Sequence, residues 1–103
     1  MSDEMSTEER QAAQKRLKDL LAIVRGMPAH HDQLARLVEE AEALDRAISA
    51  FHLEGIRFRI YNVDRVVQHP PVPLPPEALQ IVADVRRHLE NAGSHTRSHQ
   101  SPV

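Results

Sequence analysis

The sequence predicts a mainly α-helical protein with an antiparallel helical hairpin, one short β-strand or β-hairpin, a third helix and a disordered C-terminal tail. Three long segments carry apolar residues at intervals of three and four, which is typical of amphipathic helices. One segment, Gly55 to Gln68, instead alternates apolar and polar residues at period two, which is typical of a half-buried strand.

The length of 103 residues predicts one domain, residues 1–93, followed by the tail, residues 94–103. A chain of this size buries only somewhat more than ~60% of its unfolded surface, so we expect oligomerisation to complete the core. The aromatic residues Phe51, Phe58 and Tyr61 fall close together, and we expect them to mark the centre of that core.

The first helix is predicted over residues 7–25. Ser6 and Glu9 have the spacing of a capping box, which satisfies amides that the first turn would leave without partners. Arg25 and Gly26 suit the C-terminal end, where a cation and a flexible residue are favoured.

The second helix is predicted over residues 29–53, after Pro28 has interrupted the first. Its apolar residues alternate in steps of three and four, which gives a heptad seam like that of a coiled coil. They are Leu34, Leu37, Ala41, Leu44, Ile48 and Phe51. Val38 and Ala47 widen the stripe, so we expect a helical hairpin that meets further helices.

The strand is predicted over residues 56–61, with Gly55 ending the helix before it. Ile56, Phe58 and Ile60 would form its apolar face, and β-branched and aromatic residues favour a strand. Two alternatives remain open. Residues 56–68 could form a hairpin, or a helix, since Ile56, Ile60, Val63 and Val67 also recur at helical spacing.

Residues 69–76 hold most of the prolines and predict an extended linker that sets the angle of the next helix. The third helix is predicted over residues 76–91, with Gly93 as its stop. Its expected buried residues are Leu79, Ile81, Val82, Val85 and Leu89.

Composition limits the function. Without cysteine the chain can form no disulfide and no thiolate site. The net charge of −2 gives no overall basic field for nucleic acid or for an anionic membrane. The polar N-terminus and the lack of a long apolar run predict a cytoplasmic protein without a membrane segment.

The sequence gives no pattern for catalysis or for a cofactor. The seven histidines include His95 and His99 at a four-residue spacing, but no H-E-x-x-H or E-x-x-H pattern occurs, so we predict no metal site. Histidine-based metal binding is the third and least favoured functional hypothesis. The carboxylates Glu39, Glu40 and Glu42 are expected to lie on a solvated or ion-paired helix face. We therefore expect a protein that is not an enzyme.

Five arginines could form a basic patch for nucleic acid, as in dimeric regulators that read DNA with strands. They are Arg57, Arg59, Arg65, Arg86 and Arg87. Because the chain is acidic overall, ion pairing with neighbouring helices is the simpler interpretation, and a small dimeric DNA-binding regulator is the second functional hypothesis.

The leading hypothesis follows from the unpaired strand. A lone strand exposes backbone amides and carbonyls, which a second copy or another protein could cover. We therefore predict a protein-interaction or regulatory module that acts as a homo-oligomer, most simply a dimer, or binds a partner protein in an antitoxin-like or inhibitor-like role. The predicted association surface is Ile56, Phe58, Ile60, Leu37, Leu44, Ile48 and Phe51.

Overall fold

The computed structural model describes the backbone of residues 2–94 and the side chains of residues 7–94. Over that range the chain is mainly helical, as predicted, and contains no strand. The elements are α1 (Ser2–Arg25), the short 3-10 helix η1 (Pro28–His30), α2 (Ala35–Ala50), α3 (Leu53–Gln68) and α4 (Glu77–Asn91). None of these helices combines the length and the apolar character needed to cross a membrane.

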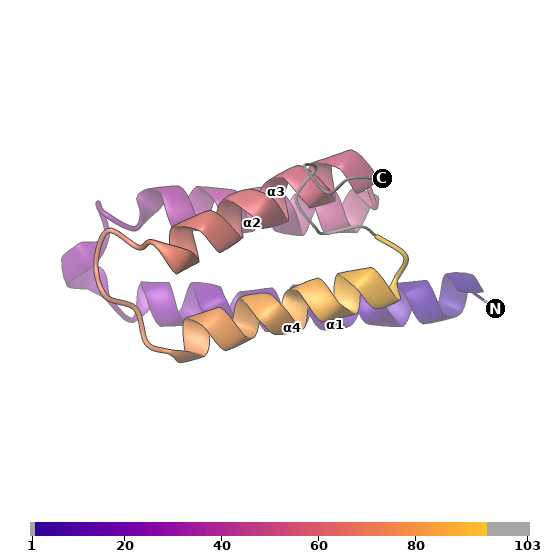
Figure 1. Ribbon diagram of the computed structural model, residues 1–103, viewed down its shortest axis with the longest axis horizontal. Helices are drawn as coiled ribbons and strands as arrows, with labels where there is room; N and C mark the ends of the chain where they lie inside the picture. Colours follow the sequence, from indigo (N-terminus) through magenta and orange to yellow (C-terminus); the bar gives the residue numbers. More distant parts are fainter. Residues whose placement is uncertain (1, 95–103) are drawn as a thin grey trace.

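The four α-helices form an elongated bundle of 45 × 29 × 21 Å, in which each helix runs opposite to the one before it (Figure 1). α1 packs mainly against α4, and α2 packs mainly against α3. Smaller contacts between α1 and α2 and between α3 and α4 close the bundle. The first two helices are thus antiparallel neighbours, but each has its main packing partner elsewhere.

The predicted strand over residues 56–61, and the alternative hairpin, are wrong because α3 is one continuous helix. Ile56, Ile60, Val63 and Val67 are all at most 4% exposed and share one face of that helix. Phe58, which made the pattern alternate, points outward and is 50% exposed. Burial of the helical stripe against the rest of the bundle decides the structure, because strand propensity depends on context.

The break between α2 and α3 lies at Phe51, not at Gly55 as the sequence predicted. Phe51 adopts a left-handed conformation with φ 48°, which ends α2. His52 then caps α3, because its Nδ1 accepts a 2.9 Å hydrogen bond from the backbone N–H of Gly55. A Cβ atom at Gly55 would lie 2.8 Å from that nitrogen, so glycine here makes room for the cap instead of stopping a helix.

The other helix boundaries differ less from those predicted from the sequence. α1 begins at Ser2, so Ser6 lies inside the helix and the predicted start at residue 7 is wrong. α1 ends at Arg25, directly before Gly26, as expected. The predicted helix over residues 29–53 is shorter, because η1 and a turn occupy its first residues and α2 begins at Ala35.

The C-terminal end of α4 closes as the sequence predicted. Gly93 has a φ of 96°, and the N–H of Ser94 donates to the carbonyl of Leu89 at 2.9 Å, which is the long bond of a Schellman motif. Ser94 is buried, so it does not belong to a disordered tail, and residues 95–103 of that predicted tail lie outside the described residues. Leu79, predicted to be buried, is 47% exposed.

The core is aliphatic and not aromatic. Leucine, isoleucine, valine and alanine from all four helices fill it, and Val72 and Leu74 of the linker over residues 69–76 pack against it. Phe51 and Tyr61 are only partly buried and Phe58 is half exposed, so the predicted aromatic centre is wrong. Of the three aromatic side chains, Phe58 is the one with a large exposed area.

Candidate functional site

Most of the predicted association surface lies inside the chain's own core. Five of the seven residues, Leu37, Leu44, Ile48, Ile56 and Ile60, have no exposed surface. Phe51 is partly buried, and the guanidinium of Arg10 lies over its ring at 4.5 Å from the centroid. Phe58 is the one predicted residue with a large exposed area, so any association through this set depends on Phe58.

The predicted arginine patch is divided by ion pairs with neighbouring carboxylates. Four of its five members are paired in this way, as the simpler interpretation of the sequence expected. The pairs are Arg57 with Glu54 at 3.2 Å, Arg59 with Glu40 at 3.1 Å, Arg86 with Asp64 at 3.3 Å and Arg87 with Asp84 at 3.0 Å. Arg65 joins none of the ion pairs found among the described side chains, and its guanidinium lies 5.8 Å from the ring centroid of Tyr61.

One surface of α3 combines these features, and we call it the outer face of α3. It consists of Glu54, Phe58, Tyr61 and Arg65, which follow one another at intervals of four, three and four residues. That spacing places them on one side of a helix, opposite the buried stripe. The Glu54 side chain is 78% exposed and Phe58 is 50% exposed, while Tyr61 is partly buried.

An arginine guanidinium lies over each of the two aromatic rings of the outer face, Phe58 and Tyr61. Arg59 lies over Phe58 at 5.1 Å, and Arg65 lies over Tyr61 at the distance given above. Such stacking is worth ~0.5–1 kcal/mol at exposed sites and restricts both side chains. Aromatic residues and arginine are also the types that carry most binding energy in protein interfaces. Three of the four residues of the outer face are of these types.

A buried carboxylate positions Arg59 for this stacking. The Glu40 side chain is only 10% exposed, and its Oε1 accepts hydrogen bonds from Arg59 at 3.1 Å and from the amide of Asn62 at 3.2 Å. Because Glu40 belongs to α2, the network also fixes α3 against α2 near the outer face. The sequence placed Glu40 on a solvated or ion-paired face, and the ion pair is what the structure contains.

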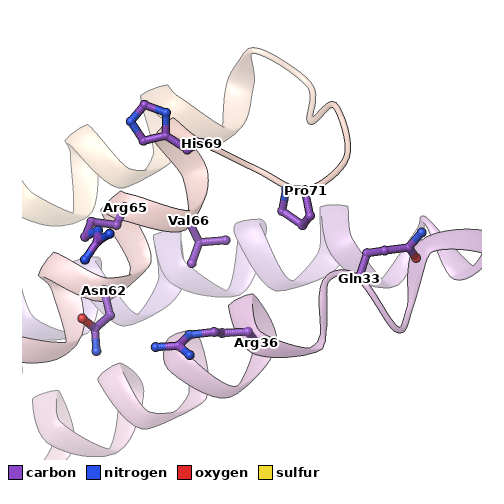
Figure 2. Close-up of a pocket in the computed structure, with 7 residues that line it drawn as sticks. All are labelled: Gln33, Arg36, Asn62, Arg65, Val66, His69 and Pro71. Carbon is purple, nitrogen blue, oxygen red and sulfur yellow. The ribbon is translucent and has the colours of Figure 1, made fainter.

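A pocket of about 570 Å³ adjoins the outer face on the side of α2 (Figure 2). Its lining residues come from α2, α3 and the segments that flank them. They are Gln33, Arg36, Asn62, Arg65, Val66, His69 and Pro71. Two arginines and a histidine line this pocket and no carboxylate does, which distinguishes it from the ion-paired surface around it.

A second polar cluster joins α1 to α4, far from the outer face along the sequence. Arg16 Nε donates to Asp84 at 2.9 Å, and His88 Nδ1 lies 2.8 Å from a carboxylate oxygen of Glu9. The pKa of Asp84 is lowered, first by the hydrogen bond from the Gln80 amide and then by those from the arginines, against the opposing effect of burial. These contacts join α1 to α4.

The histidines do not form a metal centre among the residues whose side chains the structure describes: no three histidine or carboxylate side chains there converge on a possible ion. His52 caps α3, His69 lines the pocket and His88 bonds Glu9. His95 and His99, the pair with helical spacing, lie outside the described residues.

Sequence reasoning missed the outer face because it favoured a strand over residues 56–61, which separates Phe58 and Tyr61 from Glu54 and Arg65. Once residues 53–68 are taken as a helix, the spacing of Glu54, Phe58, Tyr61 and Arg65 is visible in the sequence itself. The pocket had no such signal, since Arg36 and Pro71 approach α3 only through the fold.

Comparisons with family models, with curated proteins and with solved structures give no match for this chain. The fold and the site define a small antiparallel four-helix bundle with an exposed aromatic and arginine face.

Proposed function

We propose that this protein is a non-enzymatic interaction module that works as a homodimer, with the outer face of α3 as the dimer contact. The observation that carries the proposal is Phe58, a large apolar side chain left 50% exposed although the chain has only three aromatic residues. One of the few aromatic rings of the chain thus lies at the surface, where its burial against another molecule would be favourable.

The sequence of the outer face supports a second copy as the occupant. The intervals of four, three and four residues are the same when they are followed in the opposite direction along the helix. If two α3 helices pack antiparallel about a two-fold axis between residues 59 and 60, Phe58 of one protomer faces Tyr61 of its copy. The same operation places Glu54 opposite Arg65, so each end of the contact pairs unlike charges. An isologous interface requires this kind of self-complementarity.

The apolar gain is large enough to matter. A phenylalanine presents ~150–250 Å² when fully accessible, so each half-exposed Phe58 leaves about 100 Å² to bury. At ~25 cal/mol per Å², two copies would contribute about 5 kcal/mol to association, before the entropic cost of association is subtracted. Because association costs on the order of 4–15 kcal/mol, the contributions of Tyr61 and of the end charges are needed as well, and the expected dimer is weak.

The ion pairs described above favour this function over DNA binding, since arginines already held by carboxylates offer little free charge to phosphates. A partner protein, in the antitoxin-like or inhibitor-like sense, would then bind the surfaces that the dimer leaves exposed.

The test is the solution mass measured by size exclusion with light scattering. We expect wild-type protein to have twice the monomer mass of 11.7 kDa at concentrations on the order of 100 μM, and Phe58→Asp to be a monomer with unchanged helical circular dichroism. Leu79→Asp is the matched control, because Leu79 is equally exposed but lies on α4, and this variant should remain a dimer. A monomeric wild-type protein, or equal loss of mass in both variants, would overturn the proposal.

A further inference from the structure

We infer that the pocket between α2 and α3 binds an oxyanion, a carboxylate or a phosphate, attached to an apolar body. This inference concerns a ligand and goes beyond the proposed dimer. It depends on the charge of the lining, on its shape and on the chemistry of arginine.

The lining has positive charge that the protein itself leaves largely unneutralised. Arg65 joins no ion pair among the described side chains. Arg36 has only a long contact, 3.9 Å from Glu40, and its side chain is 72% exposed. His69 adds an imidazole to the same lining.

Glu40, the carboxylate that Arg36 approaches, does not line the pocket. Its Oε1 is already held by two donors, Arg59 and Asn62, at the distances given above. Glu40 therefore lowers the local positive charge without occupying the place of a ligand. Arg36 and Arg59 share the single charge of Glu40, and Arg65 adds a further guanidinium to the pocket lining, which leaves an excess of positive charge next to the pocket.

The pocket also has an apolar part. Figure 2 shows the polar ends of Arg36, Asn62 and Arg65 on one side, with Val66 and Pro71 in the middle and Gln33 at the far side. The volume of about 570 Å³ falls within the ~300–1,000 Å³ of small-molecule sites. A ligand with an anionic group at the arginine side and a small ring over Val66 and Pro71 fits this division.

Arginine is suited to this ligand because its planar guanidinium binds carboxylate and phosphate through two parallel hydrogen bonds. Arg65 belongs to both the pocket and the outer face of α3. Its five N–H donors allow it to pair with Glu54 of a second copy on one edge and with a ligand on another. Arg36 belongs to the pocket alone, and so it separates the two functions experimentally.

The experiment is an NMR titration of the full-length protein with phenyl phosphate, benzoate and inorganic phosphate, at constant ionic strength set with sodium chloride. We expect phenyl phosphate or benzoate to shift the amide resonances of residues 33–36 and 62–71. The tighter of the two identifies the preferred oxyanion, and weaker binding of inorganic phosphate would show that the apolar part contributes.

Arg36→Gln should weaken the binding by about tenfold, the effect of one lost charge-assisted hydrogen bond, without changing the solution mass. Arg46→Gln is the matched control, since Arg46 is an exposed arginine of α2 outside the pocket, and it should bind like the wild type. The inference is overturned if none of the three probes shifts these resonances, or if Arg36→Gln and Arg46→Gln bind equally. Neither result would test the proposed dimer, because the dimer is tested by the solution mass.

Discussion

The antiparallel contact predicts that two variants that dimerise weakly alone will form a tight mixed dimer when they are combined. The perturbation is a charge reversal at either end of the outer face, Glu54→Arg or Arg65→Glu. In a homodimer of either variant, like charges face each other at both ends of the contact. In a mixed dimer the two reversals meet, so each end again pairs an acid with a base.

The magnitude follows from the exposure of these groups. The Glu54 side chain is 78% exposed, so each pair across the dimer falls in the range of ~0.2–1 kcal/mol measured for surface ion pairs. A reversal replaces attraction by repulsion of similar size, and the dimer contains the pair twice. The dimer should therefore lose ~1–4 kcal/mol of association free energy. Solvent screening favours the lower half of that range, which corresponds to a dissociation constant raised by about tenfold.

The assay is sedimentation equilibrium of each variant alone and of the equimolar mixture, at low salt, where screening is weak. We expect both variants to dissociate about tenfold more readily than the wild type, and the mixture to recover wild-type affinity. The recovery should shrink when the salt concentration is raised.

The matched control uses Glu39→Arg and Arg46→Glu, which make the same changes of net charge on exposed positions of α2. The reasoning is refuted if the control pair behaves like the pair on α3, or if the variants on α3 dimerise as tightly alone as they do together. A parallel contact would instead place Glu54 opposite its own copy. Each variant alone would then dimerise like the wild type, and the mixture would dimerise more tightly than the wild type.

Two further predictions concern the bundle itself. Glu40→Ala should lower the free energy of unfolding by about 1–3 kcal/mol in urea titrations, because it removes a largely buried acceptor from the partly buried donors Arg59 and Asn62. Glu39→Ala, at the exposed neighbouring position, should change the free energy of unfolding by less than about 0.5 kcal/mol. Equal effects of the two substitutions would contradict the role of Glu40. The pKa of Asp84 is lowered in the folded protein, so its carboxylate stabilises the fold fully above the unfolded pKa of ~3.9, and this stabilisation is lost as the pH falls through the folded pKa. Asp84→Asn should therefore be less stable than the wild type at pH 7. In urea titrations the difference in the free energy of unfolding should shrink below about pH 4. A difference that stays constant with pH would show that the carboxylate charge is not responsible.

The helices could be predicted from the sequence wherever one periodicity was present. Leu37, Ala41, Leu44 and Ile48 form the seam of α2 and are fully buried, as the heptad spacing indicated. α4 occupies nearly the range expected from its apolar stripe and from Gly93. In these segments the local pattern and the tertiary packing favour the same structure.

The segment of α3 was mispredicted because two periodicities overlap in it. Ile56 and Ile60 fit both a strand and a helix, and Phe58 tips the local pattern toward the strand. Only contact with α2 and α4 decides between them, and a single sequence does not contain that contact. Gly55 added to the error, since its role is to admit the His52 ring, which is a close approach that no propensity predicts.

The candidate site depended on this assignment. On a strand, Phe58 shares a face with Ile56 and Ile60, which are in fact fully buried. On a helix it shares a face with Tyr61 and with the charged residues at either end. That Phe58 belongs to an association surface stays a prediction. Its neighbours on that surface would be Tyr61 and the charged residues, and not Ile56 and Ile60.

The pairing of α1 with α4 has a consequence for synthesis on the ribosome. The ion pair of Arg16 with Asp84 spans 68 residues, and the contact of Glu9 with His88 spans 79. α1 is made first, yet its main packing partner is made last, while α2 and α3 can pair as soon as both have emerged. Until α4 arrives, the apolar side of α1 has no full cover, and the nascent chain presents it to chaperones or to other chains. Slow translation of the segment before α4 would lengthen that exposure.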